Sequence, residues 1–203
     1  MKVLFKQTVA GFKLLLVMTV LFGILYPLAV WAVARIPGLS SQAEGSIVTQ
    51  NGQPVGSSLI GVDPVAKDPA HDPFFHNRPS AGSKDPLGPG DPSTSGASNK
   101  GTANEDLLAV VKQRQDLIAK REGVDPTKIP ADAVTASASG LDPQISPAYA
   151  ELQVPRVARE TGLSEDEVRK LVADNTAGRG LGMLGDPAVN VLQLNLAVAA
   201  ARR

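Results

Sequence analysis

The sequence has no cysteine among its 203 residues. This excludes disulfides, thiolate metal sites and cysteine nucleophiles, and it leaves the redox compartment open. Aromatic residues make up only 4% of the chain, so a buried core must be mostly aliphatic. The Gly-x-x-x-x-Gly-Lys-Ser/Thr pattern of a P-loop and the Gly-x-Ser-x-Gly pattern of a nucleophile elbow are also missing. Residue spacing alone therefore identifies no catalytic residue.

Histidine is nearly as scarce, with only His71 and His76. Together with Asp68 or Asp72 they carry atoms that could ligate a metal ion. A metal site needs several ligands in a fixed geometry, and no further ligand pattern surrounds this pair. We therefore interpret both histidines as polar loop residues and predict no metal site.

Acidic residues are absent from the first 35 positions, which hold four of the 20 basic residues. The rest of the chain therefore has 16 basic against 20 acidic residues, a net charge of −4. Nucleic acids are bound by basic surfaces, because their phosphates repel acidic ones. The charge distribution thus argues against a nucleic-acid partner.

The longest apolar run covers residues 14–34 and contains no charge. At about 1.5 Å per residue it reaches about 32 Å as a helix, enough to cross a hydrocarbon core of about 30 Å. A lipid-embedded backbone must satisfy its own hydrogen bonds, so the run is predicted to be helical. Pro27 removes one of these bonds and predicts a kink. Trp31 suits the membrane–water boundary.

Flanking charges predict the orientation of this helix. Lys2, Lys6 and Lys13 precede it, and after Arg35 the next basic residue is Lys67. Positive charge is retained on the cytoplasmic side, so the N-terminus is predicted inside the cell. The predicted domains are a cytoplasmic tail (1–13), a transmembrane helix (14–34), a linker (35–45) and an extracytoplasmic domain (46–203).

A cleaved signal peptide is the alternative interpretation of the N-terminus. Ala32-Val33-Ala34 fits the small-x-small pattern of a cleavage site. A signal peptide has an apolar core of about 7–15 residues, however, and this run is longer. We therefore expect a retained anchor.

The outer segment mixes strand and helix patterns, which predicts an α+β fold. Asn51-Gly52 favours a type I′ hairpin within residues 46–61, and recurring Asp-Pro pairs predict loops over 62–103. Helix patterns with a capping residue cover 104–122 and 146–161, and a capping box at Ser164 and Glu167 begins a third helix. Residues 189–196 fit a strand and a helix equally well.

Two stretches have unusually small side chains. Residues 130–147 are small and polar, which predicts a contact or tight-packing surface; a plain structural loop is the alternative. Residues 178–185 form a glycine-rich loop whose backbone amides could bind an anion. Without a preceding strand and a following helix, a glycine loop is weak evidence for such a site.

Several motifs together resemble one family, the C subunit of the Kdp potassium-transporting ATPase. They occur in that family's order after a single N-terminal helix, and the resemblance covers nearly the whole chain. The motifs are residues 56–61 (GSSLIG), 75–81 (FHNRPSA), 132–147 (DAVTASASGLDPQISP), 156–158 (RVA) and 189–196 (VNVLQLNL). The chain departs from the family's pattern at Val62, in residues 63–73 and at Pro155.

The resemblance implies a non-catalytic accessory subunit of an ATP-driven potassium uptake complex in the inner (plasma) membrane. Its partners would be a potassium-channel-like membrane subunit and a P-type ATPase subunit, which it would assist as a catalytic chaperone. This chain lacks the Asp-Lys-Thr-Gly-Thr phosphorylation sequence of that ATPase. The resemblance also implies ATP binding, with Ser95, Gly96 and Gly140 as candidate residues, whereas the predicted topology places them outside the cell, where ATP is scarce.

The alternative function is a membrane-anchored extracytoplasmic binding or hydrolytic protein. Such a protein needs a pocket where polar side chains converge. The sequence offers only the two histidines and scattered carboxylates for this role.

Overall fold

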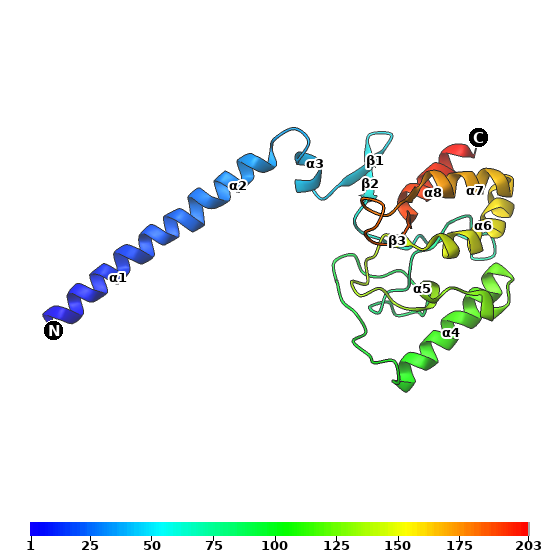
Figure 1. Ribbon diagram of the computed structural model, residues 1–203, viewed down its shortest axis with the longest axis horizontal. Helices are drawn as coiled ribbons and strands as arrows, with labels where there is room; N and C mark the ends of the chain where they lie inside the picture. Colours follow the sequence, from blue (N-terminus) through cyan, green and yellow to red (C-terminus); the bar gives the residue numbers. More distant parts are fainter. Residues whose placement is uncertain (203) are drawn as a thin grey trace. The chain divides into compact units, whose positions relative to one another are not determined.

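The computed structural model describes residues 1–202, and the chain divides into two compact units after Ile47. The first unit is dominated by one long helix, and the second is a mixed α and β domain (Figure 1). The predicted fold class, one apolar N-terminal helix followed by an α+β region, is confirmed.

The long helix runs without interruption from Lys2 to Ala34 and is exposed along its whole length. It consists of α1 (Lys2–Val20), a π turn (Leu21–Leu25) and α2 (Tyr26–Ala34). The structure accommodates Pro27 by widening the turn before it, since the Tyr26 N–H bonds to the carbonyl of Leu21. The helix also begins earlier than the apolar run, so the expected tail of residues 1–13 is helical.

A short connection follows the long helix. Arg35 lies over the ring of Trp31, 5.3 Å from its centroid, and forms an ion pair with Glu44 at 3.0 Å. The expected linker also holds a one-turn helix, α3 (Ser40–Ala43).

The predicted hairpin is confirmed. Strands β1 (Ile47–Gln50) and β2 (Gln53–Ser57) pair with each other. The turn residues Asn51 and Gly52 have φ values of 52° and 77°, the positive angles that a type I′ turn requires.

A long irregular segment then connects β2 to α4. Its described residues form turns, bends and one isolated bridge, as the Asp-Pro pairs predict. Phe75 holds this segment against the core, because its side chain is fully buried. Its backbone N–H and carbonyl also exchange hydrogen bonds with the side chain of Asn195, at 2.8 and 2.9 Å.

The three predicted helices are present with their caps. They are α4 (Glu105–Glu122), α6 (Pro147–Thr161) and α7 (Glu165–Asp174). Polar side chains accept hydrogen bonds at each start, and the capping box of Ser164 and Glu167 is formed in both directions. Gly123 and Gly162 end α4 and α6 in left-handed conformation. Pro155 lies inside α6 without ending it.

A small antiparallel sheet has the strand order β3-β5-β4, formed by β3 (Gln144–Ile145), β5 (Ala188–Asn190) and β4 (Thr176–Ala177). The ambiguous stretch 189–196 is both strand and helix: β5 ends at Asn190, whose side chain caps α8 (Val191–Ala201) by accepting from the Gln193 N–H. Two short helices, η2 (Pro126–Lys128) and α5 (Ala131–Val134), connect α4 to β3.

The core of this domain is aliphatic apart from two aromatic side chains, as the composition predicts. Helix α6 lies at its centre and buries most of one face. The fully buried large side chains include Phe75, Ile118, Ile145, Tyr149, Val154, Val157, Val168, Val189 and Leu194.

Candidate functional site

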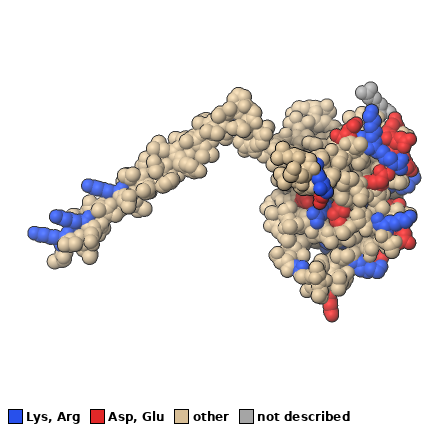
Figure 2. Space-filling model, in the orientation of Figure 1, with Lys and Arg blue, Asp and Glu red and all other residues tan. Residues whose placement is uncertain are grey.

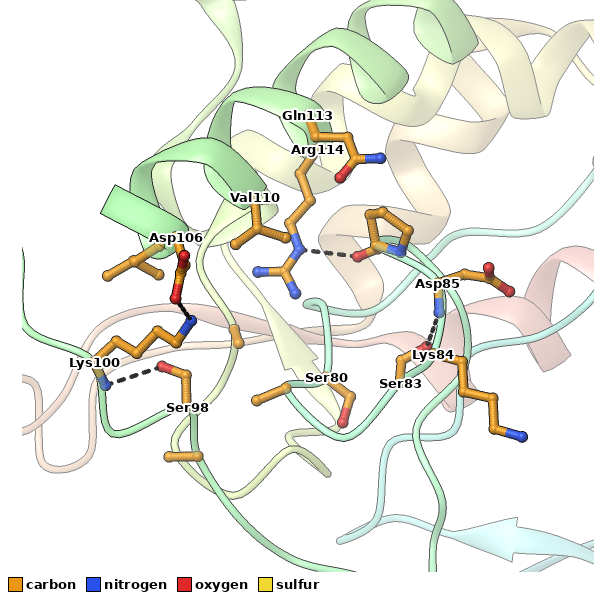
Figure 3. Close-up of a pocket in the computed structure, with 15 residues that line it drawn as sticks. Ser80, Ser83, Lys84, Asp85, Ser98, Lys100, Asp106, Val110, Gln113 and Arg114 are labelled. Carbon is orange, nitrogen blue, oxygen red and sulfur yellow. Dashed lines mark hydrogen bonds and ion pairs between the residues drawn. The ribbon is translucent and has the colours of Figure 1, made fainter. Parts of the chain in front are cut away.

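A cavity of about 510 Å³ lies beside the first half of α4 (Figure 3). One wall is the helix itself, and the others are residues 80–86, residues 97–100 and Ala136. The volume is in the range of small-molecule sites, about 300–1,000 Å³. The site is thus assembled from segments that are far apart in the sequence.

Arg114 on α4 supplies the cavity's central charge. It is 5% exposed, and Figure 3 shows its guanidinium directed into the space below the helix. Its Nε donates to the carbonyl of Pro86 at 2.9 Å and its Nη1 to that of Val134 at 3.1 Å. In residues 1–202 Arg114 makes no ion pair, and its Nη2 donates no hydrogen bond. Burial lowers the pKa of this guanidinium, because desolvation disfavours its charged form.

Three serines in the cavity wall, Ser80, Ser83 and Ser98, share one arrangement. The hydroxyl oxygen of each accepts the backbone N–H of the residue two positions later, at 3.3 to 3.5 Å. Within the described part of the chain none of these hydroxyls donates a hydrogen bond. Each serine therefore keeps an O–H donor for a ligand or for water.

Other charges at the cavity are paired or directed outward. Lys100 forms an ion pair with Asp106 at 2.8 Å. Figure 3 shows the side chains of Lys84 and Asp85 directed away from the guanidinium. The groups left facing the cavity are therefore mostly donors.

The candidate nucleotide residues Ser95, Gly96 and Gly140 are brought together, but their donor groups are bonded to the carbonyls of Ser137 and Ser139. Ser95 Oγ and the Gly96 N–H both donate to the carbonyl of Ser139, at 3.0 and 2.8 Å. A Cβ on Gly140 would lie 2.9 Å from the Gly96 carbonyl oxygen. These residues lie outside the cavity wall, although Ser80 contacts Gly140 and also lines the cavity.

This close approach is evidence for tight packing in the stretch 130–147. Gly140 has a φ of 72°, and a Cβ there would also lie 3.0 Å from Ser80 Oγ. The small side chains thus let segments of the same domain cross. The stretch is not a loop throughout, because it includes α5 and β3.

In the glycine-rich loop 178–185, backbone N–H groups bond to carbonyls of the loop itself. The N–H groups of Gly180, Gly182, Met183 and Leu184 all bond to carbonyls within residues 179–184. These four N–H groups are therefore committed to the turn and are not available to an anion.

A second polar cluster is buried around His76. Its Nδ1 lies 2.7 Å from a carboxylate oxygen of Asp63, and its Nε2 lies 2.6 Å from one of Asp72. Both ring nitrogens of His76 therefore lie against carboxylates from the same irregular segment. Burial acts to raise the pKa of Asp72, but the hydrogen bond and charge of His76, with the Phe74 N–H and Arg156, lower it below 3.8.

The cluster continues through two arginines on neighbouring helices. Arg156 donates to the Glu122 carboxylate at 3.0 Å and to the carbonyls of Asp72 and Phe74 at 2.7 and 2.9 Å. Arg121 also donates to Glu122, at 2.7 Å. The cluster joins the irregular segment to α4 and α6, which is a structural role.

The two histidines do not converge. His71 Nδ1 lies 3.0 Å from a carboxylate oxygen of Glu160 and is exposed, whereas His76 is buried. In residues 1–202 no group of three or more His, Asp or Glu side chains is arranged to hold a metal ion.

Sequence reasoning missed the two buried arginines, Arg114 and Arg156. A signal for Arg114 was present, because it lies three residues after Val111 and four before Ile118, on the same face of the helix as these apolar residues. Arginine is rarely buried without a carboxylate partner, so that position on an apolar face was the informative feature.

A membrane-anchored α+β protein with these elements matches one known family. The family described as "KdpC: K+-transporting ATPase, c chain" matches residues 8–200. A potassium-transporting ATPase KdpC subunit of Kineococcus radiotolerans is 48% identical over 199 residues, 98% of this chain and 95% of the relative. Those of Koribacter versatilis and Sorangium cellulosum are 45% and 49% identical, covering 94% and 93% of this chain and 93% and 95% of the relatives.

The chain belongs to the KdpC family and is a subunit of a potassium-transporting ATPase complex. It is a single-pass membrane protein, since it combines this family match with one N-terminal apolar helix.

Proposed function

We propose that this chain is a non-catalytic accessory subunit whose domain, residues 46–203, lies outside the cell. It holds the channel-like potassium subunit and the P-type ATPase subunit together in the inner membrane, and it assists ATP hydrolysis as a catalytic chaperone. The observation that carries the proposal is the exposed apolar helix, which has three lysines at its N-terminal end and a single arginine, Arg35, after its last residue.

The charge distribution supports the orientation. The helix is about 50 Å long, and a hydrocarbon core spans about 30 Å, so its lysine-bearing first turns extend beyond the lipid. Figure 2 shows basic side chains at the N-terminal end of this helix and an uncharged surface beyond them. Lysines are retained on the cytoplasmic side, which supports an extracytoplasmic location for the following domain.

Exposure of the helix supports a role in assembly. None of its side chains is buried within the chain. A groove on it is lined by Gly23, Pro27 and Trp31 together with Ile24 and Leu28. Small residues let transmembrane helices approach closely. We propose that this helix lies against the membrane helices of the channel-like subunit.

Of the properties that the family resemblance implies, ATP binding by this subunit has the least structural support. The donor groups of the candidates Ser95, Gly96 and Gly140 are bonded to the carbonyls of Ser137 and Ser139, and Gly96 packs closely against Gly140. We propose that the subunit raises the ATP affinity of its partner through protein contacts and leaves nucleotide binding to the ATPase subunit.

Introduced cysteines test the orientation, because the natural chain has none. Gln7→Cys lies before the apolar run, and Thr102→Cys is exposed on the domain. In spheroplasts a membrane-impermeant maleimide should label the Thr102→Cys protein and should label Gln7→Cys only after lysis. The opposite pattern would exclude an extracytoplasmic domain.

Purification through an affinity tag on this chain tests the assembly role. Two large membrane subunits should co-purify with it. In membranes that contain those two subunits but lack this chain, the potassium-stimulated ATPase activity should have a higher Michaelis constant for ATP. A deletion complex with unchanged ATP dependence would exclude the chaperone role but not the orientation.

A further inference from the structure

We propose that the cavity beside α4 binds a small oxyanion, a phosphate or carboxylate group, through the guanidinium of Arg114 and the hydroxyls of Ser83 and Ser98. The relatives' names assign no such site, and the proposal does not depend on the subunit's role in the complex.

The first argument is a buried cation without a counter-ion. Arg156 is buried to the same degree as Arg114, but Glu122 neutralises it at 3.0 Å. Among the residues that the structure describes, Arg114 has only two carbonyl partners. A buried charge is unfavourable unless it is paired, so an anion in the adjacent cavity would stabilise this arrangement.

The second argument is the excess of hydrogen-bond donors. Arg114 Nη2 and the O–H groups of Ser83 and Ser98 are donors without a partner in residues 1–202, and they come from three segments of the domain. The nearest carboxylates do not compete, because Asp106 is held by Lys100 and Asp85 is directed away. A phosphate or carboxylate oxygen accepts several such bonds and is the preferred partner of a guanidinium.

The third argument is the pre-formed geometry. The serine hydroxyls are held by backbone N–H groups, and two carbonyls fix the guanidinium. A site held in this way loses little conformational entropy on binding. The cavity of about 510 Å³ exceeds the size of one oxyanion. It can therefore hold the anion as part of a larger ligand or with water.

Calorimetric titration of the full-length protein in detergent tests the site, with inorganic phosphate and acetate as probes at constant ionic strength and neutral pH. We expect one saturable site for phosphate, for acetate or for both, and the stronger probe identifies which oxyanion is preferred. Absence of saturable binding for both up to about 10 mM, a standard free energy weaker than about −3 kcal/mol, would overturn the proposal.

Variants locate the site. Ser83→Ala combined with Ser98→Ala removes two donors without touching the core, and it should weaken binding about tenfold or more. Arg114→Lys keeps the positive charge but loses the planar donor geometry of the guanidinium. It should weaken anion binding at least as much as the double serine variant does. Lys84→Gln is the matched control, because its side chain is directed away, and it should change affinity less than about twofold.

Equal affinity in the wild type and in both the serine and arginine variants would place the anion elsewhere and overturn the proposal. Should Arg114→Lys fail to fold, the double serine variant decides alone, because its two hydroxyls lie at the cavity wall.

Discussion

Two arginines on α6 differ sharply in environment. Arg156 is buried and bonds to Glu122 and two backbone carbonyls, whereas Arg159, three residues later, has an exposed side chain and pairs with Glu160. Removing one partner from a buried network leaves other charges unpaired, which lowers the free energy of unfolding by about 3–5 kcal/mol. An exposed pair contributes about 0–1 kcal/mol.

We therefore expect Arg156→Met to lower the free energy of unfolding of the segment 46–203 by about 3–5 kcal/mol in urea titrations. Arg159→Met is the control and should lower it by less than about 1 kcal/mol. Equal effects of the two substitutions would mean that the buried cluster has no special structural role.

The carboxyl of Asp72 predicts an acid limit to stability. Its pKa is lowered below 3.8 in the folded protein, because the hydrogen bonds and charges around it outweigh the effect of burial. A depressed folded-state pKa stabilises the fold fully above pH 3.8, the ordinary value, and this contribution is lost as the pH falls through the folded value. Asp72→Asn removes the titration.

Urea midpoints measured between about pH 6 and pH 3 should therefore decline more steeply for the wild type than for Asp72→Asn. The exposed Asp174→Asn serves as a control and should follow the wild type. A parallel decline of wild type and Asp72→Asn would show that other carboxyls set the acid limit.

At the scale of elements, one wall of the cavity is held in place by a crossing of two segments, residues 80–96 and residues 137–140. Gly140 is at its narrowest point, with a positive φ, and a Cβ at this residue would have the Gly96 carbonyl oxygen and Ser80 Oγ within 3.0 Å. A side chain there meets both backbone strain and steric conflict.

We expect Gly140→Ala to destabilise the segment 46–203 by about 2 kcal/mol or more, from the left-handed conformation together with the clash. Gly178→Ala is the matched control, because nothing lies near its added Cβ and its φ is ordinary, and its effect should be within about 1 kcal/mol of zero. A Gly140→Ala domain of native stability that no longer binds its partners would instead identify this stretch as an interface.

Local signals explain which elements the sequence predicts. The caps of α4, α6 and α7 and the Asn51-Gly52 turn depend on residues within a few positions of one another, and all were predicted. The sheet β3-β5-β4 was not predicted, because its strands have two or three residues and β3 pairs with β5 across more than 40 positions. A hydrophobic periodicity cannot be recognised in strands of two or three residues.

The cavity depends on the same kind of long-range contact. Arg114 is held by the carbonyls of Pro86 and Val134, and the serines come from two loops that precede the helix. No spacing rule connects these positions. The resemblance to a family identified the protein's class, but it pointed to Ser95, Gly96 and Gly140 and not to the cavity beside them.

At the scale of the molecule, charge and apolar surface are divided between the two units. The apolar helix carries basic residues at its start, whereas Figure 2 shows basic and acidic side chains intermixed over the visible face of the domain. The net charge of −4 that follows residue 35 is therefore not gathered into an acidic patch on that face. Mixed surface charge favours solubility and gives no strong attraction for cations at a distance.

The domain should fold without the helix that anchors it. Every member of its hydrophobic core lies between Phe75 and Val198, in the second unit. We expect a chain that begins at residue 46 to be soluble without detergent and to unfold in urea in one cooperative transition. A broad transition without a native baseline would show that the anchor or the partners are needed for folding.

The same soluble domain tests what the anchor contributes. If the helix serves mainly to confine the domain near its partners, it supplies an effective concentration in the millimolar range. Added at micromolar concentration to a complex that lacks this subunit, the soluble domain should restore little potassium-stimulated ATPase activity, and restoration should rise as its concentration approaches that range. A plateau far below the activity of the anchored subunit would mean that the helix makes contacts of its own, and full activity at micromolar concentration would mean that the domain needs no tether.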